Sequence, residues 1–168
     1  AGSSPPCCVR PNGPAARKSA GLCAAYIIPI ILFALETAMR RGEILSLCRD
    51  QIDFKRSSAT ILESKNGYSR TIPLSPKAID ILVSCKGEGT RCFPISANAI
   101  RLAWQRLCKK ADVTDLHFHD LRHEAISRFF EIGLTVPEVA SISGHRDIRI
   151  LSRYAHSRSE LILKKLAN

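Results

Sequence analysis

The spacing of apolar residues changes twice along the chain. Its pattern in the first segment, up to residue 47, predicts helices. Residues 22–35 (LCAAYIIPIILFAL) are almost continuously apolar, which predicts a buried helix that ends within residues 37–41. A second short helix is expected through Glu43, Ile44, Leu45 and Leu47. Arg40 would lie at the junction of the two.

The middle of the chain has the pattern of strands. Three segments alternate or carry β-branched residues, namely QIDF at 51–54, SATILE at 58–63 and SRTIPL at 69–74. Between the last two, Lys65 is followed by Asn-Gly, a pair that favours a tight hairpin turn. A small antiparallel sheet is therefore predicted in the N-terminal half.

Everything after residue 74 has a helical pattern. Ser75 followed by Pro76 is typical of an N-cap and a first helical turn. Further helices are predicted from Ser96 to Ala111, from His119 to Gly133, from Pro137 to Gly144, from an Asp147 cap to Tyr154, and over 157–166. The fold class is α+β and mainly helical.

One domain accounts for most of the chain. Residues 1–21 are rich in Pro, Gly, Ser and Ala without hydrophobic periodicity, so we expect a flexible leader there. Residues 22–168 are enough for one hydrophobic core of ordinary size.

Composition indicates a folded, basic protein. A formal net charge of +10 and a pI of about 9.6 accompany an apolar fraction of 45%. A polyanionic partner is the leading inference, although nucleic acid and an anionic membrane surface attract Lys and Arg alike. The seven cysteines are odd in number and form no C-x-x-C pair, which is typical of reduced thiols in a cytoplasmic protein.

The apolar run has an alternative interpretation as a signal sequence or anchor. Arg10, Arg17 and Lys18 precede it, as a charged region precedes a signal peptide. A membrane span needs about 20 apolar residues, whereas this run contains Pro29 and soon reaches Glu36. A buried core helix is the better interpretation, and a membrane-anchored or secreted protein rests on this run alone.

Four residues of the C-terminal third are the candidates for chemistry. His119 and Arg122 are three apart on a predicted helix, so both can reach one small anion, and His145 and Tyr154 follow in order. Taken singly, each has an ordinary explanation, such as a local ion pair for the first two and a core aromatic for Tyr154. Tyr154 is the only tyrosine that follows this cluster, because Tyr26 lies in the apolar run and Tyr68 in the predicted turn.

Taken together, these segments resemble the catalytic domain of tyrosine recombinases, the phage integrase family. The resemblance covers about residues 30–156 and rests on motifs in the family's own order: TAMRRGEILSL with DQIDF, SKNGYSRTIPLS, HFHDLRHEAISRF and ISGHRDIRILSRYAH. It implies that the chain cleaves and rejoins DNA strands through a covalent 3′-phosphotyrosyl intermediate.

The resemblance also implies which side chains bind the DNA phosphate. Arg40 and Arg122 would grip the scissile phosphate, His145 would bond to the same group, and Glu43 would anchor Arg40. Guanidinium groups and an imidazole can neutralise charge that builds on phosphorus, so no metal or other cofactor is expected. His117, His119 and His123 lack a Cys or carboxylate that would complete a recognisable ligand set.

Proton transfer would fall to three other residues. Tyr154 would be the nucleophile, and a free phenol, with a pKa near 10, is only about 0.1% ionised at neutral pH. His119 would therefore act as the base or hydrogen-bond partner that helps to take its proton. Lys65 would protonate the leaving 5′ oxygen.

The chain also departs from the family's pattern. Members carry an N-terminal helical core-binding domain, for which we expect this sequence to have no room, and Ala38 stands where many have Gly, a change expected to matter little. The expected partner is double-stranded DNA, bound by four protomers on two duplexes, with a monomer in isolation. We expect a cytoplasmic, nucleoid-associated protein of bacterial or phage origin. Two alternatives stay open: a DNA-binding integrase remnant without turnover, and a type IB topoisomerase.

Overall fold

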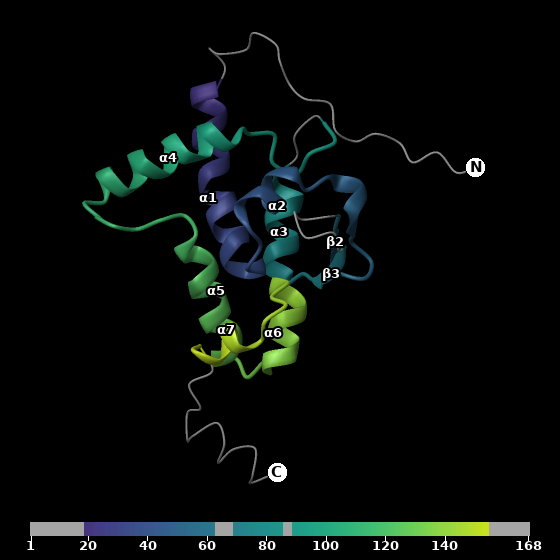
Figure 1. Ribbon diagram of the computed structural model, residues 1–168. Coiled ribbons are helices and arrows are strands. Elements are labelled where there is room, and N and C mark those ends of the chain that lie inside the picture. The colour runs from purple at the N-terminus through teal and green to yellow at the C-terminus, as the bar shows by residue number, and fades with distance from the viewer. Residues whose placement is uncertain (1–18, 63–68, 86–88, 155–168) are drawn as a thin grey trace.

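The computed structural model describes residues 19–62, 69–85 and 89–154 (Figure 1). Within them the chain forms helices around a small sheet, so the predicted α+β, mainly helical class is confirmed. The elements are α1 (Ser19–Thr37), α2 (Arg41–Ser46), the 3-10 turn η1 (Arg49–Gln51), β1 (Ile52–Asp53), β2 (Ser58–Ile61), β3 (Arg70–Pro73), α3 (Pro76–Ser84), α4 (Ala97–Lys110), α5 (Asp120–Glu131), α6 (Val136–Ser143) and α7 (Arg149–Ser152).

The sheet has the predicted antiparallel arrangement. Its strands follow the order β1-β2-β3, with Ala59 of β2 opposite both Ile52 of β1 and Ile72 of β3. These three side chains alternate with exposed ones and face the core, as period-two patterning requires. The predicted Asn-Gly turn lies outside the described residues.

Helix α1 runs through the main hydrophobic core. It packs against α3, α4 and α5, and its residues Ile30 and Phe33 are fully buried. The helix begins at Ser19, so it includes the small residues 19–21, which precede the apolar run that predicted it. Small residues such as these carry no hydrophobic period, which is why the pattern placed the start too late. Among the described residues, no helix is long and apolar enough to cross a membrane.

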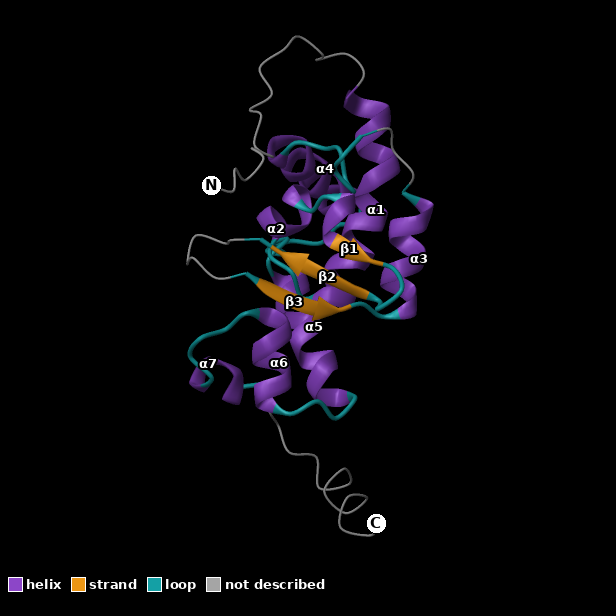
Figure 2. Cartoon of the chain, turned by 90° about the vertical axis from the view of Figure 1, so that its right-hand side faces the viewer, coloured by secondary structure: helices purple, strands orange, loops and turns teal. Residues whose placement is uncertain are grey.

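A second, smaller apolar cluster supports the C-terminal part of the domain. It joins Ala38, at the end of α1, to Ala125 and Ile126 of α5, Val139 of α6 and Leu151 of α7. Figure 2 shows α6 and α7 on one side of the sheet and α2 and α4 on the other. The segment that carries Tyr154 therefore rests on this cluster rather than on the main core.

The helix ends follow their sequence signals, with one exception. The Ser75 and Ser96 side chains cap α3 and α4, and Gly144 ends α6 in the left-handed conformation, with φ of +71°. The prediction that the helix after Asp147 carries Tyr154 was wrong, because α7 ends at Ser152. The Tyr154 amide instead bonds to the Leu151 carbonyl, three residues back, so the chain leaves the helix in a tighter turn. The predicted helix over 157–166 lies outside the described residues.

Four cysteines are described, and no disulfide joins any of them to another. Cys48 and Cys85 are buried, as expected of small core residues, and Cys108 is partly buried. Cys92 is buried as well, and burial raises the pKa of its thiol to about 11.

Candidate active site

Arg122 is the most deeply buried cation of the candidate site. It lies on α5 with 3% of its surface exposed, and its guanidinium donates to the carbonyls of Ala38 and Ser143, the latter at 2.6 Å. Its Nη2 also lies 3.5 Å from Nε2 of His145. Burial, and then the charge of Arg40, lower the pKa of Arg122 to about 10, so the group remains a cation at neutral pH. The Arg122 guanidinium is thus fixed by two backbone carbonyls, one just after α1 and one at the end of α6.

Arg40 is positioned by Glu43, as the resemblance implied. The Arg40 backbone amide donates to Glu43 Oε2 at 2.9 Å, and its Nη1 donates to Oε1 at 3.0 Å. The two residues thus close the first turn of α2 on itself, while 37% of the Arg40 side chain remains exposed. An approaching anion can therefore reach this guanidinium.

Arg70 of β3 is a third cation, which sequence reasoning missed. It forms a bidentate pair with Glu43, at 3.0 and 2.8 Å, and its Nε donates to the Ile142 carbonyl at 3.1 Å. A signal existed, since Arg70 is two residues from the buried Ile72 and so lies on the inward face of its strand. Buried cations need partners, and Glu43 is the partner here.

Glu43 is nearly buried between the two arginines. Burial alone raises its pKa, but hydrogen bonds from Arg70 and from the Arg40 backbone outweigh that effect, and the pKa falls below its usual value of 4.5. The carboxylate is therefore ionised across the neutral range, and it joins α2 to β3.

His145 is held as a neutral ring by Ser143. The buried Ser143 hydroxyl donates its single hydrogen to the Val139 carbonyl at 2.6 Å, so it can only accept from His145 Nδ1, 2.7 Å away. This arrangement places the ring proton on Nδ1 and a lone pair on Nε2, which faces Arg122. Burial, and then the charges of Arg122 and Arg40, lower the pKa of His145 to about 4.

Tyr154 contacts His123, a residue to which the sequence assigned no role in the reaction. The phenol oxygen lies 2.5 Å from His123 Nδ1, and the two rings are close to parallel, with 18° between their planes. The Arg153 guanidinium lies 5.0 Å from the centre of the Tyr154 ring. Nothing in the sequence was a reason to assign His123 a role, because a histidine on a charged helix has many ordinary explanations.

His119 lies one helical turn before His123, and the two rings are in contact. Its ring meets the His123 ring edge-on, with the centroids 5.0 Å apart. Burial, and then the charges of His123 and Arg122, lower the pKa of His119 below its usual value. His119 thus borders the partner of the tyrosine, and its own predicted contact with Tyr154 stays a prediction.

The remaining predicted residue, Lys65, lies outside the described residues, as does Tyr68. The two strands that flank Lys65 in sequence, β2 and β3, are described and pair with each other.

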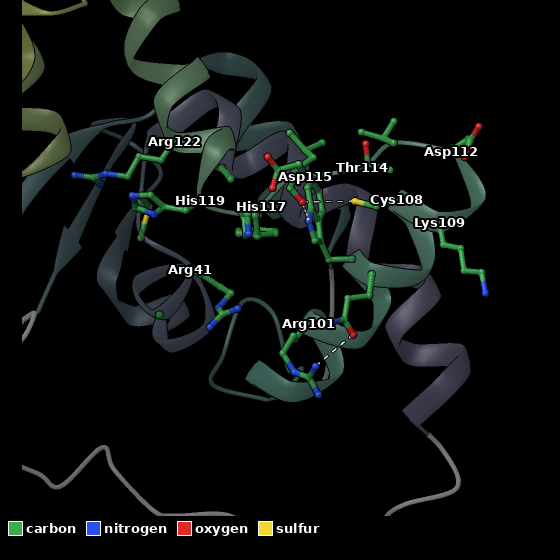
Figure 3. Close-up of a pocket in the computed structure, with 18 residues that line it drawn as sticks. Arg41, Arg101, Cys108, Lys109, Asp112, Thr114, Asp115, His117, His119 and Arg122 are labelled. Carbon is green, nitrogen blue, oxygen red and sulfur yellow. Dashed lines mark hydrogen bonds between the residues drawn. The ribbon is translucent and has the colours of Figure 1, made fainter.

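A pocket of about 920 Å³ opens beside Arg122, between α4, α5 and the loop that joins them. Figure 3 shows His119 and Arg122 together at one end of this pocket, and Lys109 and Asp112 at the other. Arg41 and Arg101 add positive charge to its lining, and Trp104 adds an aromatic surface. Across the described ranges, no group of three His, Cys, Asp or Glu side chains could hold a metal ion.

Chemically, the site combines fixed positive charge with a phenol. Two guanidinium groups can bind a phosphate and stabilise the charge that develops on it, while the phenol is a potential nucleophile. Such a set contains the groups that phosphoryl transfer to a tyrosine requires.

Comparison with known proteins identifies the family. Residues 16–160 match the sequence profile described as the phage integrase family. The chain belongs to this family, and its fold is that of the tyrosine recombinase catalytic domain.

Individual relatives agree with this assignment. The shufflon-specific DNA recombinase of Escherichia coli is 47% identical over 142 residues, which are 82% of this chain and 36% of that protein. This chain therefore spans about a third of that relative's length.

Two solved structures share the fold. The catalytic domain of bacteriophage HP1 integrase is 24% identical, with a TM-score of 0.62 over 84% of this chain and 85% of that one. The Tn1549 transposon integrase in complex with transposon right end DNA is 18% identical, with a TM-score of 0.66 over 95% of this chain and 66% of that one.

Proposed function

We propose that the chain is the catalytic domain of a site-specific DNA recombinase that cleaves and rejoins strands through a 3′-phosphotyrosyl intermediate. The observation that carries this proposal is that Tyr154 lies against α5 beside the buried cation Arg122, in a site drawn from separate segments. Arg40 precedes α2, Arg122 lies on α5 and His145 follows α6, and the charges of Arg40 and Arg122 both act on His145.

In the proposed cleavage step, the Tyr154 oxygen attacks the scissile phosphorus. An O–P bond to tyrosine forms as the bond to the 5′ oxygen breaks, and that oxygen leaves with a proton, for which Lys65 is the proposed donor. Arg122 and Arg40 would stabilise the additional negative charge on the phosphoryl oxygens. Because the phosphotyrosine retains the energy of the broken bond, rejoining needs no ATP.

The proposed partner is double-stranded DNA in the cytoplasm of a bacterium. A net charge of +10 favours a polyanion, and the Tn1549 transposon integrase, which shares the fold, was solved with DNA. We propose that four protomers act on two duplexes, because rejoining to a new partner requires two duplexes with two cleaved strands each.

The direct test is covalent capture of DNA. The protein is incubated with fragmented bacterial DNA and denatured, and whatever stays attached is sequenced, which would report both activity and target site. Tyr154→Phe should abolish capture and leave DNA binding intact, because only the nucleophilic oxygen is lost.

Tyr26→Phe is the matched control, since Tyr26 packs against the main core on α1 and should be dispensable for capture. Capture by Tyr154→Phe at the wild-type level would contradict the proposal. Relaxation of supercoiled plasmids at arbitrary sequences would instead favour a topoisomerase.

A further inference from the structure

The contact between Tyr154 and His123 assigns a role to a residue outside the six predicted ones. We infer that His123 is a catalytic residue of the proposed cleavage step, in which its Nδ1 accepts the phenol proton of Tyr154 as the phenol oxygen attacks phosphorus. This inference rests on the function proposed above and deepens it.

The geometry suits direct proton transfer. The phenol oxygen and Nδ1 are 2.5 Å apart, within the reach that a general base needs. His123 directly follows Arg122 on α5, so one rigid helix carries both the phosphate-binding cation and the acceptor of the proton. The near-parallel rings keep the phenol oxygen beside the ring nitrogen.

The neighbouring groups are poor alternatives as acceptors. Arginine has no acceptor atom, which excludes Arg122 and Arg153. The one lone pair on the His145 ring faces Arg122, and its other nitrogen is engaged by Ser143. Among the described side chains at this position, His123 is thus the base in contact with the nucleophile.

The charges around His123 also fit this role. Its ring is surrounded by His119 and Arg122 on its own helix, by Tyr154 and Arg153 after α7, and by His145 after α6. The lowered pKa values of His119 and His145 leave both rings neutral at neutral pH. A proton that arrives on His123 therefore meets no second imidazolium, and the phosphate brings negative charge that offsets Arg122.

The proton balance is closed. The O–H bond of Tyr154 breaks and its proton moves to Nδ1, while the oxygen's electron pair forms the bond to phosphorus. The bond from phosphorus to the 5′ oxygen breaks, and that oxygen takes a proton from a separate acid. In rejoining, the 5′ hydroxyl attacks the phosphotyrosine and returns its proton to the conjugate base of the separate acid, while the departing tyrosine recovers its proton from His123.

The test uses the duplex recovered by wild-type capture and measures the single-turnover rate of covalent adduct formation. His123→Ala should slow this rate by about 10²–10⁴ at neutral pH, as expected for loss of a general base. The deficit should shrink as the pH rises, because hydroxide then replaces the base. His123→Asn places a polar atom near Nδ1 but accepts no proton, so it should be as slow as His123→Ala.

A second substrate separates the two proton transfers. When sulfur replaces the bridging 5′ oxygen, the leaving group departs as a thiolate and needs no acid. The His123→Ala deficit should persist on this substrate, while that of Lys65→Ala should largely disappear. His117→Ala is the matched control, since its side chain is 74% exposed, and it should react at the wild-type rate.

Several outcomes would overturn the inference. Wild-type rates for His123→Asn would leave His123 with a positioning role only, and so would a His123→Ala deficit that does not vary with pH. Nitrogen-15 NMR of the free protein gives a readout independent of activity, because Nδ1 must carry a lone pair, and a protonated Nδ1 would contradict the assignment. If wild-type protein captures no DNA while Nδ1 carries its lone pair, the proposed function fails and the contact itself stands.

Discussion

The arginine side and the tyrosine side of the site are held in different ways. Arg122 and Arg70 each bond to two other segments of the chain, and Glu43 accepts hydrogen bonds from both Arg40 and Arg70. Tyr154 follows a helix of four residues, Leu151 packs below it in the small apolar cluster, and His123 is its hydrogen-bond partner.

This difference follows from the chemical groups on each side, which are buried charges on one and a neutral phenol on the other. A buried charge is costly unless it is paired and fully hydrogen-bonded, so the cations require a network that spans several elements. A phenol needs only apolar support and one polar partner. The proposed phosphate-binding groups are therefore fixed by the fold, whereas the proposed nucleophile depends on few contacts and its position is the easier one to change.

On the arginine side of the site, the largest effect is expected at Arg122. Arg122→Ala should lower the rate of covalent adduct formation by about 10²–10³, by analogy with removal of one donor from an oxyanion site. Arg128→Ala is the matched control on the same helix, because Arg128 forms only an exposed pair with Glu124. An equal loss in both variants would show that the charge of α5, and not the buried geometry, matters.

The next effect is on stability, at Glu43. Glu43→Gln should lower the free energy of unfolding by about 3–5 kcal/mol, because it leaves the largely buried Arg70 without its counter-charge. Glu124→Gln, in an exposed pair, should cost about 0–1 kcal/mol. Chemical denaturation of both variants measures the difference.

The same carboxylate predicts an acid dependence. The pKa of Glu43 is lower in the folded chain than its usual 4.5, so its contribution is present above pH 4.5 and is lost as the pH falls through the lower, folded value. Wild-type protein should therefore lose this contribution below pH 4.5, and Glu43→Gln should lack that component of the titration. A parallel pH dependence in the two proteins would contradict the assignment.

The smallest effect concerns Gly144, which joins the two sides. Gly144→Ala should cost about 1–2 kcal/mol for the left-handed backbone, and its methyl group would also lie 3.0 Å from the Arg70 guanidinium. Gly133→Ala is the matched control, since Gly133 also has a positive φ, +95°, with open space around it. Chemical denaturation measures the loss of unfolding free energy in both variants. The amount by which the loss for Gly144→Ala exceeds that for Gly133→Ala is the part caused by the contact with Arg70.

Local signals in the sequence predicted much of the fold. The caps at Ser75 and Ser96, the alternation in the strands and the glycine stop of α6 each depend on neighbours within a few residues. Arg70, by contrast, pairs with a residue 27 positions away and with the Ile142 carbonyl 72 positions away, and no local pattern encodes such distances.

The site could be predicted only in part, because some of its contacts also join residues that are far apart in the sequence. Family motifs marked Arg40, Arg122, His145 and Tyr154, but the contact of Tyr154 with His123 spans 31 residues and depends on how α7 packs. Ala38, which was expected to matter little, has a backbone conformation and a hydrogen bond that bear on the site. Its φ is +51°, in the region that favours glycine, and its carbonyl accepts a hydrogen bond from Arg122.

The two carbonyls that hold Arg122 have a further electrostatic consequence. Ala38 directly follows the last residue of α1, and Ser143 is the last residue of α6, so the guanidinium lies where the C-terminal ends of two helices meet. Each such end carries the equivalent of about half a negative charge from the helix macrodipole. The cation is thus offset by backbone dipoles rather than by a carboxylate of its own, and a phosphate that binds it displaces no acidic side chain.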